Sequence, residues 1–110
     1  MITVVICKDQ KGSYKGFYCM GHAEYAKKGQ PDIVCAAVSA VTVGTVNALE
    51  ELGHVGLEAV MNEETGFLKC DFHDVLQEKC IFLMDSMVLT LQNISREYGE
   101  KYLKVNFKEV

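Results

Sequence analysis

The sequence predicts an α+β fold in which a single, mostly antiparallel sheet carries two long helices, in the order ββαββαβ. Two long segments with helical periodicity alternate with pairs of short segments rich in β-branched and aromatic residues. Hydrophobic residues make up 49% of the chain and charged residues 24%, with one proline, which is typical of a folded globular protein. At 110 residues the chain has the length of one domain, which we expect to span residues 1–110.

The first three predicted elements are two strands and a long helix. Ile2–Lys8 is rich in β-branched residues, and the turn sequence DQKGS separates it from a second strand at residues 14–22. Apart from Gly44, no turn signal interrupts residues 33–52, and Gly53 follows as the expected C-cap of a helix. This helix is apolar on almost every side and rich in small residues. We therefore expect it to be buried against the sheet or against a second subunit.

The remaining elements are a second hairpin, a second helix and a last strand. Residues 56–62 and Phe67–Phe72 flank the turn sequence EETG, which predicts the hairpin. Apolar residues keep helical spacing over residues 74–98, where Asp74 is placed to cap the start of the helix. Residues 101–110 alternate apolar and polar side chains, which predicts a half-exposed strand.

The net charge and the N-terminal segment bear on which partners and which cellular location we expect for the protein. A net charge of −4 disfavours general nucleic-acid binding, which depends on lysine and arginine side chains that neutralise phosphates. We expect no direct nucleic-acid binding, and the acidic surface suits a basic polypeptide partner. The chain starts without a basic leader or a signal cleavage site, and no run reaches the roughly 18 apolar residues of a membrane span. We therefore expect a cytoplasmic protein with no membrane partner.

The five cysteines suggest neither a disulfide framework nor a zinc ribbon, because their number is odd and no CxxC pair occurs. Four of them are expected to be small buried hydrophobic residues: Cys7, Cys19, Cys70 and Cys80. The spacing of Cys70, His73 and Cys80 fits no common metal site, so we expect no metal and no cofactor. His54 and His73 are expected to be polar surface residues.

The stretch GHAEYAKKGQPDIVCAAVS contains a candidate catalytic pair. His22 closes the second predicted strand, Asp32 stands at the N-cap of the first helix, and Cys35 lies in its first turn. There the thiol faces free backbone N–H groups and the positive end of the helix dipole, and both favour a thiolate. An imidazole from the neighbouring strand can take the thiol proton, and the helix amides are candidate oxyanion donors. The sequence therefore offers His22 and Cys35 as a candidate pair for covalent catalysis, and the alternative is a surface histidine and a core cysteine.

The polar segment between these two residues is a candidate substrate loop. It contains two lysines, a glycine and few apolar anchors, so we expect it to be mobile in the free protein and to close over a bound peptide. The candidate loop residues are Ala23, Glu24, Tyr25, Lys27, Lys28 and Gly29.

The segment GHAEYA followed by GQPDIVCAAVS resembles the signature of the bacterial ribosomal-processing cysteine proteases, the Prp family. The resemblance extends over the whole chain in length and element order. It implies a cytosolic, homodimeric endopeptidase that removes a short N-terminal extension from a large-subunit ribosomal protein, cutting beside aromatic residues. It also implies that His22 is the base and Cys35 the nucleophile. The loop before Asp32 carries one extra residue, with Pro31, relative to the family pattern.

Three further residues of this pattern are expected to support the pair. Gly21 allows close backbone approach beside the histidine, and Asp32 caps the helix. Ser39 lies one turn after Cys35 on the same helix face, where its hydroxyl has either a supporting role or a hydrogen bond to the helix backbone.

Two other classes of function stay open. In a non-enzymatic, dimeric, ribosome-associated binding module, Cys35 contributes only packing, and its replacement by alanine is tolerated. In a thiol redox switch, Cys35 is oxidised rather than acylated, which normally requires a resolving thiol nearby. The sequence places no second cysteine next to Cys35.

Overall fold

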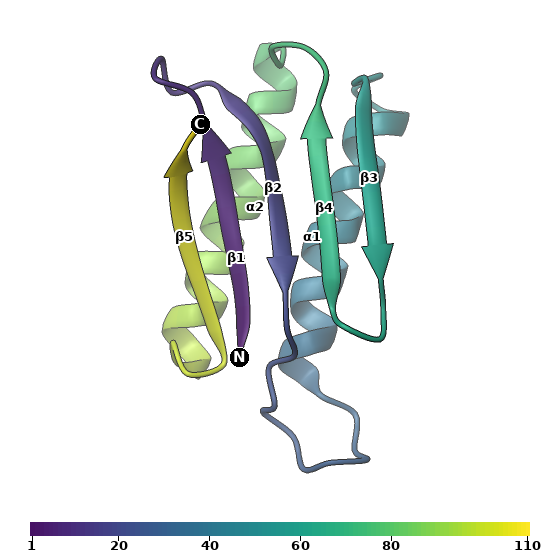
Figure 1. The fold of residues 1–110 in the computed structure, drawn as a ribbon, viewed down its shortest axis with the longest axis vertical. Helices are drawn as coiled ribbons and strands as arrows, with labels where there is room; N and C mark the ends of the chain where they lie inside the picture. Colours follow the sequence, from purple (N-terminus) through teal and green to yellow (C-terminus); the bar gives the residue numbers. More distant parts are fainter.

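The computed structural model describes residues 1–110 as a five-stranded sheet with both helices on one face (Figure 1). The elements are β1 (Ile2–Lys8), β2 (Tyr14–Met20), α1 (Ile33–Glu51), β3 (Leu57–Asn62), β4 (Phe67–Phe72), α2 (Glu78–Tyr98) and β5 (Leu103–Glu109). The strand order is β3-β4-β2-β1-β5, in which only the β1–β5 pair is parallel. The predicted fold class and element order are confirmed.

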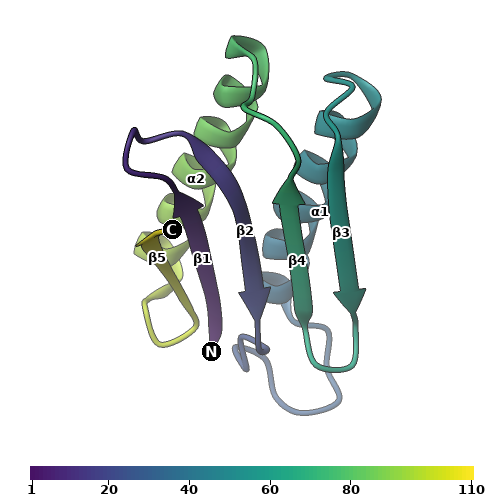
Figure 2. The same cartoon turned by 45° about the horizontal axis from the view of Figure 1, so that its top comes forward.

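The core lies between the sheet and the two helices, which run side by side behind it (Figure 2). β1 contributes Val4 and Ile6, and α2 contributes Met84 and Leu91, all of them fully buried. Burying an aliphatic side chain of this size stabilises the fold by roughly 1.5–3 kcal/mol. The layered arrangement leaves the ends of the strands free to carry loops.

Two element boundaries differ from the prediction. β2 ends at Met20 rather than residue 22, because Gly21 has a φ of 92° and turns the chain out of the sheet. α2 begins at Glu78, with Gln77 as its N-cap, so the prediction that Asp74 caps this helix is wrong. The segment before α2 is neither helix nor strand, but Leu76 is buried there, and so it continued the apolar spacing without being helical.

The end of α1 also differs from the prediction. Leu52 is the C-cap, and the residue in the left-handed conformation is His54, with a φ of 52°, rather than Gly53. Gly53 is needed for another reason: a Cβ there would lie 2.6 Å from Sγ of Cys80. The glycine therefore lets the end of α1 approach the start of α2. His54 and His73 are exposed, as predicted.

In the single chain α1 is buried along one stripe only, and burial of its other sides would require the second subunit that the sequence also allows. Ile33 and Leu52 are 55% and 72% exposed, and Val60 and Met61 of the neighbouring β3 are more than half exposed. By length and mean hydropathy (1.6) this 19-residue helix meets the criteria for a membrane span, which the expectation from apolar runs missed. A core helix passes the same test, and here α1 packs on α2, and its buried residues share one core cluster with those of the sheet.

Candidate active site

Three segments meet at one end of the molecule, beside the N-terminus and the first turn of α1 (Figure 1). They are the end of β2, the loop that follows it and the turn between β3 and β4. The Gly21 N–H donates to the carbonyl oxygen of Thr65 in that turn, at 3.3 Å. The amino group of Met1 donates to the carbonyl oxygen of His22, at 2.6 Å. The backbone around His22 is therefore held from two sides.

Asp32 caps α1, as predicted, and it also binds the preceding loop. One carboxylate oxygen accepts hydrogen bonds from the N–H groups of Val34 and Cys35, at 3.0 and 3.1 Å. The other accepts from Tyr25 and Ala26, at 2.8 and 3.1 Å. Burial alone would raise the pKa of Asp32, but these four donors favour the carboxylate and hold the pKa below its ordinary value.

Cys35 is half-buried in the first turn of α1, where the sequence placed it. Its Sγ accepts a hydrogen bond from the Ala23 N–H at 3.3 Å, which joins the start of the loop to the thiol. The N–H groups of Val34 and Cys35 already donate to Asp32. These two helix amides are therefore occupied, and the Ala23 N–H is the backbone donor that contacts the sulfur.

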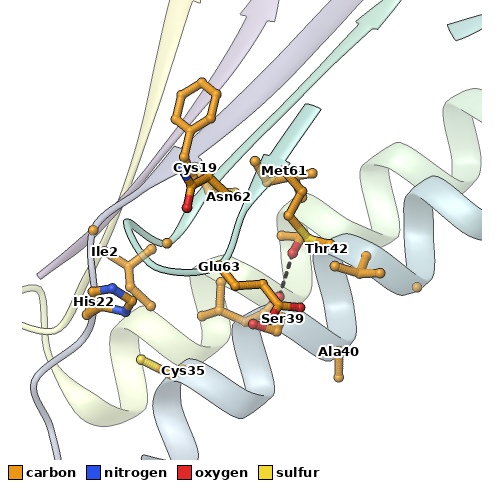
Figure 3. A pocket seen from close by; sticks show the side chains of 17 residues that line it. Ile2, Cys19, His22, Cys35, Ser39, Ala40, Thr42, Met61, Asn62 and Glu63 are labelled. Atoms are coloured by element: carbon orange, nitrogen blue, oxygen red, sulfur yellow. Dashed lines mark hydrogen bonds between the residues drawn. The ribbon is translucent and has the colours of Figure 1, made fainter. Parts of the chain in front are cut away.

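His22 is oriented by a backbone carbonyl. Its Nε2 lies 2.8 Å from the carbonyl oxygen of Glu64, in the turn between β3 and β4. A carbonyl oxygen only accepts hydrogen bonds, so Nε2 carries a hydrogen and Nδ1 is left as the acceptor. No hydrogen bond joins His22 to Cys35, whose side chains line the same hollow (Figure 3). Such contacts are often loose in a free enzyme and tighten when substrate binds.

The hollow is a groove of about 590 Å³ between α1 and the β3–β4 hairpin, and it contains the candidate pair at one end. A volume of this size is typical of a ligand-binding site. Its apolar lining includes Val38, Val43, Met61, Phe67 and Leu68. Its polar lining includes Ser39, Asn62 and Glu63. The groove can therefore hold apolar side chains of a ligand beside the thiol.

Ser39 lines this groove, and its hydroxyl makes no hydrogen bond within the protein. The sequence allowed a hydrogen bond from the Ser39 hydroxyl to the helix backbone. Two threonines of the same helix make such bonds instead. Thr42 donates to the carbonyl oxygen of Val38, and Thr45 to that of Val41. The Ser39 hydroxyl is therefore free to bind a ligand.

The loop between His22 and Asp32 is anchored in its first half, so the expectation of few apolar anchors is wrong there. Ala23 is fully buried, and the ring of Tyr25 packs edge-on against Tyr98 and Tyr102, with centroids 5.3 and 5.0 Å apart. The second half, which includes the remaining candidate residues Lys27, Lys28 and Gly29, is exposed, as is Glu24. The sequence signal for this anchor was a tyrosine in an otherwise polar loop.

The other four cysteines have different surroundings from Cys35. Cys19, Cys70 and Cys80 are buried as predicted, whereas Cys7 is half-exposed. Burial raises the pKa of Cys19 and of Cys70 to about 12 and also raises that of Cys7. Cys19 lines the same groove as Cys35, but a thiol with this pKa stays protonated at neutral pH and resolves oxidised cysteines poorly. This argues against the redox switch.

We expect Cys35 to be alkylated before the other four cysteines. Iodoacetamide reacts with thiolates, and only Cys35 combines partial exposure with a position at a helix N-terminus. Peptide mapping by mass spectrometry after a short exposure to the reagent measures the order. Cys7 is the internal control, because it is also half-exposed but its pKa is raised. Modification of Cys7 or Cys19 ahead of Cys35 would contradict the expectation.

The comparisons with known proteins agree with this geometry. The family model of the cysteine protease Prp matches residues 1–104. The chain belongs to the Prp family of cysteine proteases. The ribosomal processing cysteine protease Prp of Bacillus subtilis is 34% identical over 106 residues, which cover 91% of this chain and 92% of that protein.

Two crystal structures of the Prp protease from Staphylococcus aureus have the same fold. One, in complex with a covalently linked product peptide, superposes with a TM-score of 0.89 at 30% identity, covering 98% of this chain and 100% of that one. The other, in complex with a substrate peptide, has a TM-score of 0.85 at the same identity and coverage. The suspected Prp resemblance is confirmed.

Proposed function

We propose that this chain is a ribosomal-processing cysteine endopeptidase with His22 as base and Cys35 as nucleophile. The observation that carries the proposal is the groove in which a half-buried thiol at a capped helix start lies with a histidine oriented by a backbone carbonyl. Its relatives are named ribosomal processing proteases, and one of them binds a substrate peptide. The proposed substrate is the short N-terminal extension of a bacterial large-subunit ribosomal protein.

The proposed reaction uses the thiol, the imidazole and one water molecule. Nδ1 of His22 takes the proton of the Cys35 thiol, and the thiolate attacks the carbonyl carbon of the scissile bond. The C–N bond then breaks as Nδ1–H gives its proton to the leaving amine, and a thioester remains. Water gives a proton to Nδ1 and hydroxide to the thioester. The C–S bond breaks, the new carboxyl end leaves, and the proton returns to the sulfur.

The Ala23 N–H is the proposed donor to the oxyanion of this reaction. In the free protein it donates to Sγ of Cys35 at 3.3 Å, so it lies close to the atom that attacks the substrate. A carbonyl oxygen of a substrate bound to that sulfur would lie within reach of the same N–H group, where one such donor stabilises the transition state by about 3 kcal/mol. Gly21 and Asp32 hold the two ends of the segment that positions this amide.

The groove favours a substrate with large apolar side chains. Val38, Met61 and Phe67 lie along it, and aromatic side chains fill such surfaces with the largest buried area. This fits the cleavage beside aromatic residues that the family pattern implies. The net charge of −4 favours the basic body of a ribosomal protein over an acidic one.

We also propose that residues 1–110 form one protease domain that acts as a homodimer in the cytoplasm. Several large apolar side chains of α1 and its C-cap and of the edge strand β3 are more than half exposed: Ile33, Leu52 and Val60. A second copy that covers these side chains would remove them from water.

The exposed half of the loop is proposed to order when a peptide binds. Lys27, Lys28 and Gly29 are exposed, and their N–H groups make no hydrogen bonds within the protein. In the inactive Cys35→Ala protein, we expect weak hydrogen-exchange protection at these amides and a rise when a substrate-like peptide with aromatic residues is added. The amides of Tyr25 and Ala26, which bind Asp32, should stay protected throughout. Strong protection of residues 27–29 without peptide, or no change on binding, would show a rigid connector instead.

The function is tested by incubating the protein with a ribosomal protein that carries its N-terminal extension. Intact-mass spectrometry should show loss of the extension as one discrete fragment. EDTA should leave the rate unchanged, because no step of the proposed reaction uses a metal ion, whereas alkylation of Cys35 should stop it. An uncleaved substrate would contradict the proposal.

A further inference from the structure

We propose that the turn between β3 and β4, residues 63–66, is the third part of the catalytic centre and positions His22. The inference rests on the proposed function and adds to it a group that does not itself touch the substrate. The main-chain carbonyl of Glu64 accepts a hydrogen bond from Nε2–H of His22, at 2.8 Å. That bond leaves Nδ1 as the only ring nitrogen able to take the thiol proton.

The turn contributes backbone carbonyl groups, rather than side chains, to its contacts with His22 and its neighbour. Besides the bond from His22, the turn accepts a hydrogen bond from the Gly21 N–H to the carbonyl oxygen of Thr65. Two consecutive residues of the turn therefore bind the two residues that follow β2, Gly21 and His22. This double contact sets both the path of the chain and the orientation of the imidazole ring.

The turn has a fixed shape of its own. Oδ1 of Asn62 accepts hydrogen bonds from the N–H groups of Glu64 and Thr65, at 3.0 and 3.4 Å. This is the arrangement in which an asparagine side chain closes a turn two residues ahead. The carbonyl of Glu64 is thus presented by a pre-formed turn, so little ordering is needed when a substrate arrives.

Gly66 permits the close approach of the turn to the histidine. Its φ is 68°, and a Cβ at this position would overlap the carbonyl oxygen of Gly21 and lie 3.3 Å from Cε1 of His22. The first of these neighbours is backbone, which cannot swing away as a long side chain does. Any residue other than glycine must therefore push the turn and the imidazole apart. Gly66 is a positioning residue, since it acts only through His22.

The first experiment determines the tautomer of His22 in the wild-type protein. Two-bond ¹⁵N–¹H spectra of the imidazole separate the Nε2–H tautomer from the Nδ1–H tautomer. We expect neutral His22 to be the Nε2–H tautomer, and an Nδ1–H tautomer would overturn the proposal. This readout needs no cleavage, so it stands even if the proposed substrate is not cut.

The second experiment compares Gly66→Ala with Gly12→Ala. Gly12 has a φ of 84° and nothing within 4 Å of an added Cβ, so it carries the same backbone strain at the distant β1–β2 turn. We expect Gly66→Ala to lower kcat/KM by about 10²-fold, mainly through kcat, because a misplaced catalytic group costs about that factor. Gly12→Ala should keep the wild-type value. Equal activity of the two variants, with wild-type cleavage intact, would refute the positioning role and leave the protease assignment standing.

The third experiment shows that the effect passes through the imidazole. Gly66→Ala should slow alkylation of Cys35, but in a His22→Ala background the same change should have no further effect. Additive slowing in the double variant would mean that Gly66 acts on the fold rather than on His22, and it would overturn the proposal. Thermal melting of each variant confirms that the rates compare folded proteins.

Discussion

Replacing either Cys35 or His22 with alanine will abolish peptide cleavage and leave the fold intact. The two residues act as a unit, so either loss alone is expected to lower kcat/KM by about 10⁴-fold or more, and the double variant should be little worse. His22 is exposed and Cys35 half-buried, so neither change removes a large part of the core. Cleavage followed by mass spectrometry measures the rate, and circular dichroism checks the fold.

Cys7→Ala is the matched control for this prediction. Cys7 is also half-exposed, but it lies on β1 and does not line the groove. The Cys7→Ala variant should cleave the substrate at the wild-type rate. If Cys35→Ala or His22→Ala cleaves at nearly the wild-type rate, the catalytic pair is wrong. If Cys35→Ala retains the biological function as well, the chain is a binding module.

Two substitutions of Asp32 will distinguish its role as the N-cap of α1 from its role in holding the loop. Asp32→Ala removes the acceptor of all four hydrogen bonds, and loss of the cap alone should destabilise the protein by about 1–2 kcal/mol. Asp32→Asn has one acceptor oxygen and an NH₂ group that only donates. It can cap the helix but cannot also accept from Tyr25 and Ala26. We expect it to be nearly as stable as the wild type and still impaired in cleavage.

Urea denaturation and cleavage rates distinguish these outcomes. If Asp32→Asn cleaves as fast as the wild type, the bonds to the loop have no role in catalysis. If both variants lose the same stability, the cap is not the main contribution. The control is Asp9→Asn, whose carboxylate accepts backbone hydrogen bonds in the distant β1–β2 turn.

The contribution of Asp32 to stability also has a defined pH dependence. Its pKa in the folded protein is below the ordinary value of 3.8, so the folded state binds the proton less tightly than the unfolded state. The stabilisation is therefore fully present above the unfolded pKa and is lost as the pH falls through the folded pKa. The stability difference between wild type and Asp32→Ala should be constant near neutral pH and shrink below about pH 4.

Local signals in the sequence were sufficient for much of the fold and for part of the site. An aspartate before an apolar run placed the N-cap of α1 and hence Cys35 in its first turn, because capping depends on residues two or three apart. The same reasoning failed at Asp74, where Leu76 continued the apolar spacing in a segment that is not helical. Periodicity indicates which side chains are buried, and a non-helical segment can bury a side chain in phase with a helix.

The rest of the site depends on contacts between distant segments. The bond from His22 to the Glu64 carbonyl joins residues 42 positions apart, and a backbone carbonyl has no sequence signature. The packing of Tyr25 against Tyr98 and Tyr102 brings a loop onto the junction of α2 and β5, which requires knowing how the helices lie on the sheet. The left-handed conformation of Gly66, with a φ of 68°, had no sequence signal beyond the turn sequence EETG.

The contact of Gly53 with Cys80 fixes the C-terminal end of α1, which is the end remote from the Cys35 thiol. Nineteen residues at 1.5 Å per residue give a length of about 28 Å, and Cys35 lies in the first turn, at the opposite end from this contact. Tilting the helix to admit a larger substrate would press Gly53 against the Cys80 side chain of α2. Adjustment to different peptides must then come from the exposed half of the loop, residues 27–30, because the β3–β4 turn is itself held by its bonds to Asn62. The thiol and the turn are the stationary groups against which this half of the loop moves.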